Sequence, residues 1–231
     1  MSHQTNVQTV PFPLQGGCAC GNIRYMLAVA PLVIHCCHCT SCQRETGTGF
    51  ALNALVEGDG VTLLPPRSSA ATSSPPAVQA QPQLSFPASL RDTYTPKQSR
   101  PVDDNDSSAH ETSQATIPSP ILVPVPTESG APQHIARCPA CLTPVWSTYG
   151  GMPLLKFLRV GSLDSPALLG GPDVYIFLRS KLPYIEIPDD DKPRFDAFYP
   201  QKEGIWGPEA MVRREKLLER IKAWSKETGV E

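Results

Sequence analysis

The chain has 231 residues, of which 40% are hydrophobic and 18% charged, and a formal net charge of −2. This length suits one or two domains, and the near-neutral charge gives no field that would attract nucleic acid or an anionic membrane. The sequence contains no apolar run of about 18 residues, and its first residues lack the basic and apolar segments of a signal peptide. We therefore expect no membrane span and predict a cytoplasmic protein.

Residues 12–64 combine six of the eight cysteines with several strand-like runs. Over residues 22–29, large apolar residues stand at every second position, at Ile23, Tyr25, Leu27 and Val29. This period of two predicts a half-buried strand. Further strands are expected over 51–56 and 61–64, where Gly and Pro punctuate the apolar runs.

Residues 65–134 contain no cysteine and hold 13 of the 26 prolines, with many Ser, Thr, Gln and Asp. Such a segment buries too little apolar surface to offset its ordering entropy, so we predict a disordered insertion. A tolerated surface insertion is favoured because loop-closure entropy grows only logarithmically with length, and a regulated tether is the alternative. The apolar stretch 121–123 would suit an edge strand, although prolines bracket it.

Residues 135–206 return to a globular composition and carry the last two cysteines. We predict that they form a single discontinuous zinc-binding domain with residues 12–64. The strands expected in this part of the chain are 145–148, 154–160, 174–178 and 184–187.

Residues 207–229 are predicted to form an amphipathic C-terminal helix. Pro208 stands in its first turn and Gly229 lies past its end. One face gathers the apolar residues Ala210, Leu217, Leu218, Ile221 and Trp224. We expect this face to dock on the sheet, with a dimer interface as the alternative. The predicted fold class is therefore mainly β with a C-terminal helix.

Two cysteine pairs lie far apart in the sequence, Cys18 with Cys20 and Cys138 with Cys141. Without a secretory leader, reduced thiols that bind metal are favoured over disulfides. The second pair has the spacing of a zinc knuckle, which redox pairs share. Two pairs of the same ligand type together predict a closed tetrahedral zinc site that holds the fold.

A third cluster places four cysteines and one histidine within residues 36–42. Once the two pairs are set aside, Cys37, Cys39 and Cys42 can supply three thiolates. Three protein ligands with a vacant fourth position are typical of a catalytic zinc, at which a substrate thiol would be deprotonated. The spacing leaves an alternative open, in which Cys36 or His38 closes the site. We expect Cys36 to point to the other face of its strand and His38 to stay outside the ligand set.

These motifs resemble the family of glutathione-dependent formaldehyde-activating (GFA) enzymes, which includes centromere protein V. The resemblance covers about residues 15–64 and 134–200, and its closing segment is similar to fungal-like members in particular. The matching stretches are GCACGNIRY (17–25), CHCTSCQR (37–44) with Thr46-Gly47, CPAC (138–141), RVGSL (159–163), DVYIF (173–177) and RSK (179–181).

The resemblance implies a zinc-ribbon-like β-tent fold that binds two zinc ions per chain. The implied structural zinc has the ligands Cys18, Cys20, Cys138 and Cys141. The implied second zinc, with its reactive position open, has the ligands Cys37, Cys39 and Cys42. The implied activity is that of a carbon–sulfur lyase, which condenses a zinc-bound glutathione thiolate with formaldehyde to give S-(hydroxymethyl)glutathione.

The sequence also fits two other functions. One is a non-catalytic zinc-binding interaction module that resembles centromere protein V, and the other is a structural domain with both sites closed. A chromatin-binding module should carry a basic tract, which the sequence lacks, so small-molecule thiols and aldehydes are expected as partners rather than nucleic acid.

Two residues near the motifs carry expectations of their own. Leu142 stands where the family usually has glycine after the last knuckle cysteine. A left-handed backbone there would cost roughly 1–2 kcal/mol, which the metal can offset. Arg44, close to the second cluster, is either a partner for a glutathione carboxylate or a solvated surface residue.

Overall fold

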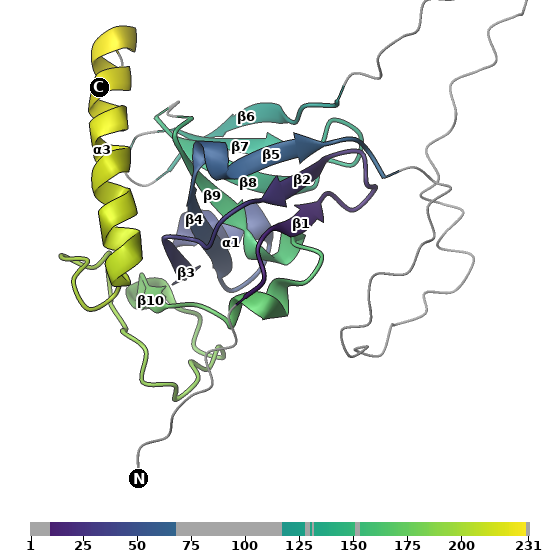
Figure 1. The fold of residues 1–231 in the computed structure, drawn as a ribbon. Helices are drawn as coiled ribbons and strands as arrows, with labels where there is room; N and C mark the ends of the chain where they lie inside the picture. Colours follow the sequence, from purple (N-terminus) through teal and green to yellow (C-terminus); the bar gives the residue numbers. More distant parts are fainter. Residues whose placement is uncertain (1–9, 68–116, 128–129, 131, 151–152, 230–231) are drawn as a thin grey trace, which may run out of the picture.

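The chain folds into two open β-sheets and a long C-terminal helix (Figure 1). A computed structural model describes residues 10–67, 117–127, 130, 132–150 and 153–229. Most of the predicted insertion, 68–116, lies outside the described residues. Among the described residues, no helix combines the length and the apolar character needed to cross a membrane.

The smaller sheet has the order β1-β2-β5 and is antiparallel throughout. Its strands are β1 (Leu14–Gly17), β2 (Arg24–Leu27) and β5 (Val61–Leu64). Ile23, Tyr25 and Leu27 are fully buried, as predicted. The alternation is incomplete, however, because Arg24 is also buried and forms an ion pair with Asp164. Val29 lies beyond the end of β2 and is 40% exposed.

The larger sheet has the order β10-β3-β4-β9-β8-β7-β6, in which only the β10–β3 pair is parallel. Its strands are β3 (Val33–Cys37), β4 (Ala51–Glu57), β6 (Ile121–Val125), β7 (Gln133–Arg137), β8 (Pro144–Tyr149), β9 (Leu155–Arg159) and β10 (Val174–Ile176). Because β4 pairs with β9, segments from both sides of residues 68–116 are neighbours in one sheet.

The larger sheet has a hydrophobic core on each of its faces. Successive side chains of a strand point to opposite faces. Ala54 and Val56 accordingly join a core with the small sheet, whereas Leu55 joins a second core with Ala210 and Leu217 of the C-terminal helix. The fold is thus layered as small sheet, large sheet and helix.

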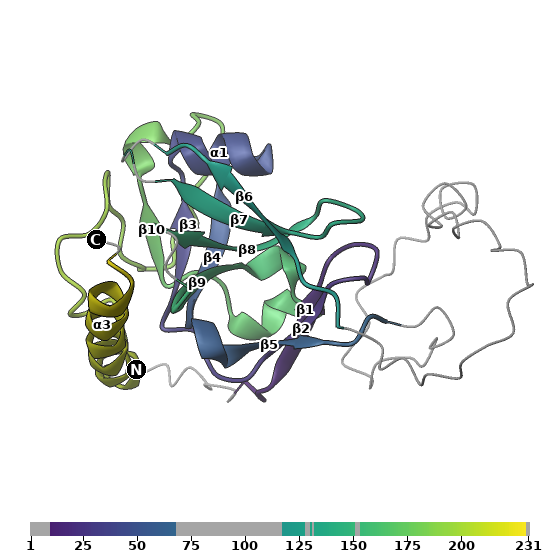
Figure 2. The same ribbon diagram turned by 90° about the horizontal axis from the view of Figure 1, so that it is seen from above.

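The C-terminal helix α3 (Pro208–Thr228) stands along one side of the molecule, beside β3 and β4 (Figures 1 and 2). Gly229 ends it in a left-handed conformation, as the sequence predicted. Beyond its apolar face, Arg213 forms an ion pair with Glu57 at 2.6 Å and donates to the carbonyl of Ala30. A mainly β fold with a docked C-terminal helix is therefore confirmed.

Short helices connect the strands. Helix α1 (Thr40–Thr46) follows β3, and the 3-10 turns are η1 (Gly58–Gly60), η2 (Val160–Ser162), η3 (Pro166–Leu169) and η4 (Leu178–Ser180). Of these, α1 and η4 border the candidate site described below.

Two expectations from the sequence need correction. The predicted strand over 184–187 is wrong: this segment makes no strand pairing, Tyr184 is 76% exposed, and Lys181 Nζ donates to the carbonyl of Ile185 at 2.7 Å. The predicted disordered insertion over 65–134 extends too far, because β6 and the start of β7 lie inside it. Pro124 is tolerated in β6 because an edge strand does not need every backbone donor.

Candidate metal centres

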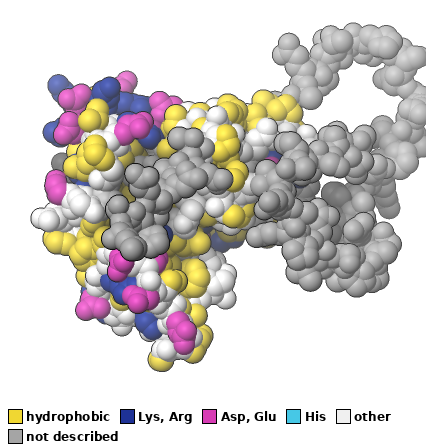
Figure 3. Space-filling view, turned by 60° about the horizontal axis from the view of Figure 1, so that its bottom comes forward, with side chains coloured by type: hydrophobic (Ala, Val, Ile, Leu, Met, Phe, Trp, Pro, Cys, Tyr) yellow, Lys and Arg dark blue, Asp and Glu magenta, His cyan; other side chains and the backbone are white. Residues whose placement is uncertain are grey.

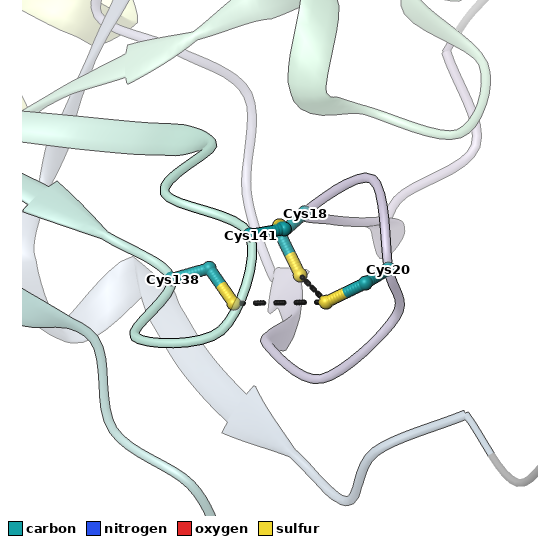
Figure 4. A group of neighbouring side chains, drawn as sticks. All are labelled: Cys18, Cys20, Cys138 and Cys141. Carbon is teal, nitrogen blue, oxygen red and sulfur yellow. Dashed lines mark hydrogen bonds between the residues drawn. The ribbon is translucent and has the colours of Figure 1, made fainter. Parts of the chain in front are cut away.

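The first cysteine group lies where the two sheets meet. Cys18 and Cys20 follow β1, and Cys138 and Cys141 stand in the turn between β7 and β8. Figure 4 shows the four side chains pointing toward one another from these two turns. Their sulfur atoms all lie within 4.8 Å of one another, so the structure brings this predicted set together.

The spacing of these four sulfurs fits a tetrahedral metal ion. Cys18 Sγ lies 3.5 Å from Cys20 Sγ, which in turn lies 3.7 Å from Cys138 Sγ. Zinc–sulfur bonds of about 2.3 Å in a tetrahedron place the sulfurs roughly 3.8 Å apart. All eight cysteines are free thiols, and these separations are far longer than a disulfide bond of about 2.05 Å.

Donors from the surrounding chain point at the sulfurs of this four-cysteine group. The backbone N–H of Ile23 donates to Cys18 Sγ at 3.2 Å, and Asn22 Nδ2 donates to Cys138 Sγ at 3.8 Å. Such hydrogen bonds stabilise the thiolate form that a metal needs. They act against burial, which raises the pKa of Cys18 and raises that of Cys20 to about 12.

The knuckle turn adopts the backbone that the sequence predicted. Leu142 has a φ of 59°, in the left-handed region, and its side chain is exposed. Its N–H donates to the carbonyl of Cys138 at 2.9 Å, and its carbonyl accepts from Arg137 Nη1 at 3.0 Å. The leucine thus occupies a glycine-like position without displacing the four sulfurs.

The second cysteine group comes from one short segment at the end of β3 and the start of α1. The sulfurs of Cys37, Cys39 and Cys42 lie within 4.8 Å of one another. Cys39 is the N-cap of α1, and its sulfur accepts the N–H of Cys42 at 3.3 Å. A hydrogen bond with Cys37, followed by one with Cys42, lowers the pKa of Cys39 to about 2, so its thiolate forms most easily.

Neither of the alternative fourth ligands joins these three sulfurs. Cys36 Sγ lies instead 3.4 Å from His38 Nε2, and both residues are buried. Burial raises the pKa of Cys36 to about 12, which keeps it a neutral thiol. Among the described residues, no fourth His, Cys, Asp or Glu completes this group.

The three cysteines line a cavity of about 460 Å³, a volume within the usual range for small-molecule sites. Aromatic and aliphatic side chains make most of its wall, with a few polar groups among them. The other lining residues are His35, Ser41, Asn53, Thr127, Tyr149, Phe157, Ile176, Phe177, Arg179 and Phe198. The four-cysteine group contributes nothing to this lining, so the two groups face different surroundings.

The segment that precedes α3 closes part of this cavity. Phe198 lines it and stacks on Tyr199 at a centroid distance of 4.2 Å. Trp206 Nε1 donates to Tyr199 Oη at 2.8 Å, which leaves the tyrosine proton free for His35 Nε2, also at 2.8 Å. Burial lowers the pKa of His35 to about 4, so this ring is neutral near pH 7.

Sequence reasoning missed several of these cavity residues. They include Asn53, Phe177 and Phe198. The only sequence signal for this part of the cavity wall is the high aromatic content of residues 195–206. Arg44, by contrast, is exposed on α1 and does not line the cavity, which favours the solvated alternative.

Comparison with known proteins agrees with the cysteine motifs. Residues 13–81 match the model of the family described as glutathione-dependent formaldehyde-activating enzyme. The match contains Cys18, Cys20 and the whole 36–42 cluster, and it ends before the second knuckle pair. No curated protein matches the chain significantly. The resemblance predicted from the sequence is thus confirmed over this first part of the chain.

Proposed function

From this match to the GFA family, we propose that the chain is a zinc-dependent carbon–sulfur lyase. The proposed reaction resembles that of S-(hydroxymethyl)glutathione synthase and joins the glutathione thiolate to formaldehyde or a related electrophile. The observation that carries the proposal is a group of three cysteines on the wall of a ligand-sized cavity. We also propose a cytoplasmic location, where thiols stay reduced.

The two donor sets fit zinc in different ways. Cys18, Cys20, Cys138 and Cys141 offer the four sulfurs of a closed structural site. Cys37, Cys39 and Cys42 offer three. Zinc held by three thiolates supplies a coordination position at which a thiol loses its proton at neutral pH.

The remaining chemistry asks little of the protein beyond positioning. The glutathione sulfur forms a bond to the aldehyde carbon, the carbonyl π electrons move to oxygen, and that oxygen takes up the proton given up by the thiol. Atoms and electrons balance without an oxidant or a reductant. Phe157, Phe177 and Phe198 on the cavity wall would exclude water and hold the two reactants together.

The test uses purified, zinc-loaded protein with ¹³C-labelled formaldehyde and glutathione. NMR exchange would measure the rate of S-(hydroxymethyl)glutathione formation above the spontaneous rate. We expect acceleration by the wild type, its loss in Cys39→Ser, and its retention in Cys36→Ser. Cys36 is the matched control because it is buried beside the cluster yet outside it.

The same experiment addresses the alternative of a non-catalytic interaction module. Protein that binds two metal ions but leaves the spontaneous rate unchanged would contradict the lyase and favour that module. On the face shown in Figure 3, Lys and Arg side chains lie among Asp and Glu side chains, so this face offers no uniformly basic surface.

A further inference from the structure

A strained turn presents a cation to the cavity that the three cysteines line. Phe177 has φ 57° and ψ 40°, a left-handed conformation that costs a non-glycine residue roughly 1–2 kcal/mol. Such strain persists where the surroundings enforce it, commonly at functional sites. The turn η4 begins directly after Phe177, and both Phe177 and Arg179 line the cavity.

This turn is fastened to the cysteine segment itself. Gln43, on α1, donates through Nε2 to the carbonyls of His38 and Ser180, each at 2.7 Å. The N–H of His38 donates to the carbonyl of Ile176 at 3.0 Å. Arg179 is therefore carried on a turn whose position relative to the three sulfurs is fixed by hydrogen bonds on both sides.

The charge of Arg179 is available to a ligand. Its guanidinium carbon lies 5.6 Å from the centroid of the Phe177 ring, and the residue is exposed. No ion pair within the described part of the chain involves Arg179. The buried Arg159, in contrast, is paired with Glu45.

We propose that Arg179 is the anion-binding residue of this cavity and selects a thiol that carries a carboxylate. A guanidinium binds a carboxylate through two parallel hydrogen bonds, and the ring of Phe177 holds it in place. The substrate sulfur would reach the three cysteines while its carboxylate meets Arg179. This inference rests on the proposed function and names the residue that recognises the substrate's carboxylate.

The test compares two thiols on zinc-loaded protein, one anionic and one neutral. Glutathione and 2-mercaptoethanol would be titrated into the wild type, Arg179→Gln and Arg44→Gln, with binding followed by calorimetry. We expect Arg179→Gln to weaken the affinity for glutathione roughly tenfold or more. Its affinity for 2-mercaptoethanol should stay within about twofold of the wild-type value. Arg44→Gln, whose arginine is exposed but outside the cavity, should match the wild type.

The outcomes separate the subsite from the proposed function. If the wild type binds both thiols and Arg179→Gln binds glutathione with the same affinity, the assignment of Arg179 is overturned and the proposed function is not. Equal weakening of both thiols would also overturn it, because a carboxylate contact cannot act on 2-mercaptoethanol. Wild-type protein that binds neither thiol would overturn the proposed function and the subsite with it.

The side chain of Asn53 faces the sulfur of Cys42. Asn53 on β4 and Arg159 on β9 are partners in the strand register. Arg159 Nη1 donates to Asn53 Oδ1, and a guanidinium can only donate, so the amide nitrogen must point the other way. That nitrogen lies 4.0 Å from Cys42 Sγ. Glu45, on the same helix as Cys42, pairs with Arg159 and is almost fully buried.

We infer that Asn53 is a positioning residue that donates an N–H to the Cys42 thiolate, oriented by Arg159 and Glu45. Donors of this kind around metal ligands typically change metal affinity by about 10–100-fold. Asn22, which donates to Cys138 Sγ at 3.8 Å, is the matched residue at the four-cysteine group.

The test loads the protein with cobalt, which reports on sulfur ligands by charge-transfer absorption. We expect Asn53→Leu to weaken the binding of one of the two cobalt ions about tenfold or more and to shift the absorption of that ion alone. Asn22→Leu should instead affect the other cobalt ion. Asn53→Asp keeps the shape and serves if Asn53→Leu fails to fold. An unchanged spectrum and affinity in a folded Asn53 variant would overturn the inference.

Discussion

The two cysteine groups use the same ligand atom but differ in how much chain they connect. Cys20 and Cys138 are 118 residues apart and belong to turns of different sheets. Cys37, Cys39 and Cys42 all come from the six residues at the junction of β3 and α1. A metal ion bound by the four-cysteine group would close a long loop and so remove much conformational entropy from the unfolded chain. A metal ion bound by the three-cysteine group would remove little.

The two cysteine groups also differ in their surroundings. The four-cysteine group is built by the β1–β2 and β7–β8 turns, with Cys20 exposed at the surface, and the three-cysteine group lines a cavity. A closed ligand set has nothing left to offer a substrate, but an incomplete one beside a cavity has. Sulfur count, chain separation and an adjoining cavity therefore distinguish the proposed structural site from the proposed reactive site.

Removing one sulfur from each group should have very different effects on the two groups. Cys138→Ser should leave little folded protein, because structural zinc contributes about 10 kcal/mol or more in small domains, comparable with the whole stability of a domain. Cys39→Ser should remain folded and lose one metal ion. Serine also caps helices well, so this substitution preserves the start of α1.

Thermal melts and metal counts on the same samples measure both effects, with Cys36→Ser as the control. Equal destabilisation by Cys138→Ser and Cys39→Ser would contradict the division into a structural and a reactive group.

A second test concerns the segment between the two halves of the four-cysteine group. The described chain on either side of residues 68–116 emerges on the same side of the molecule, so a short Gly/Ser linker can replace them (Figures 1 and 2). We expect this deletion to leave the melting temperature and metal content nearly unchanged.

Extending the same deletion through Val125 would remove β6 and expose the edge of β7. The melting temperature should then fall by several degrees, since roughly 1–3 kcal/mol is lost. Equal behaviour of the two deletions would show that β6 contributes nothing to the sheet.

The knuckle turn offers a small gain in stability. Leu142→Gly should stabilise the protein by about 1 kcal/mol, because glycine adopts the left-handed backbone without a steric cost. For a chain of this size, that corresponds to a rise in melting temperature of about 2–4 °C. A fall instead would mean that the exposed leucine side chain makes a contact worth more than its strain.

Much of the fold could be predicted because its signals are local. The alternation around Tyr25, the punctuation around β4 and β5, and the Pro208 and Gly229 signals of α3 all reflect backbone preferences. The segment 184–187 misled because a short apolar run has no fixed structure without a neighbouring strand. The edge strand suggested at 121–123 is confirmed as β6, but its partner β7 could not be identified from the sequence because their pairing is a tertiary contact.

The cysteine groups could be predicted from spacing, but the cavity could not. Asn53, Arg179 and Phe198 come from three distant segments that meet only when β4, η4 and the chain before α3 pack together. No periodicity or short motif encodes that meeting. The bend that brings Arg179 to the cavity depends on the left-handed Phe177, which nothing in the local sequence demands.

Cobalt absorption can show whether the three-cysteine group alone accepts a thiol. Protein loaded with two cobalt ions should show a change in sulfur-to-cobalt absorption on addition of glutathione, and its amplitude should correspond to one ion per chain. Cys39→Ser, with one cobalt ion bound, should show no change. A response from one ion per chain is therefore expected. Protein with two bound cobalt ions whose absorption glutathione leaves unchanged would show that neither group accepts the thiol.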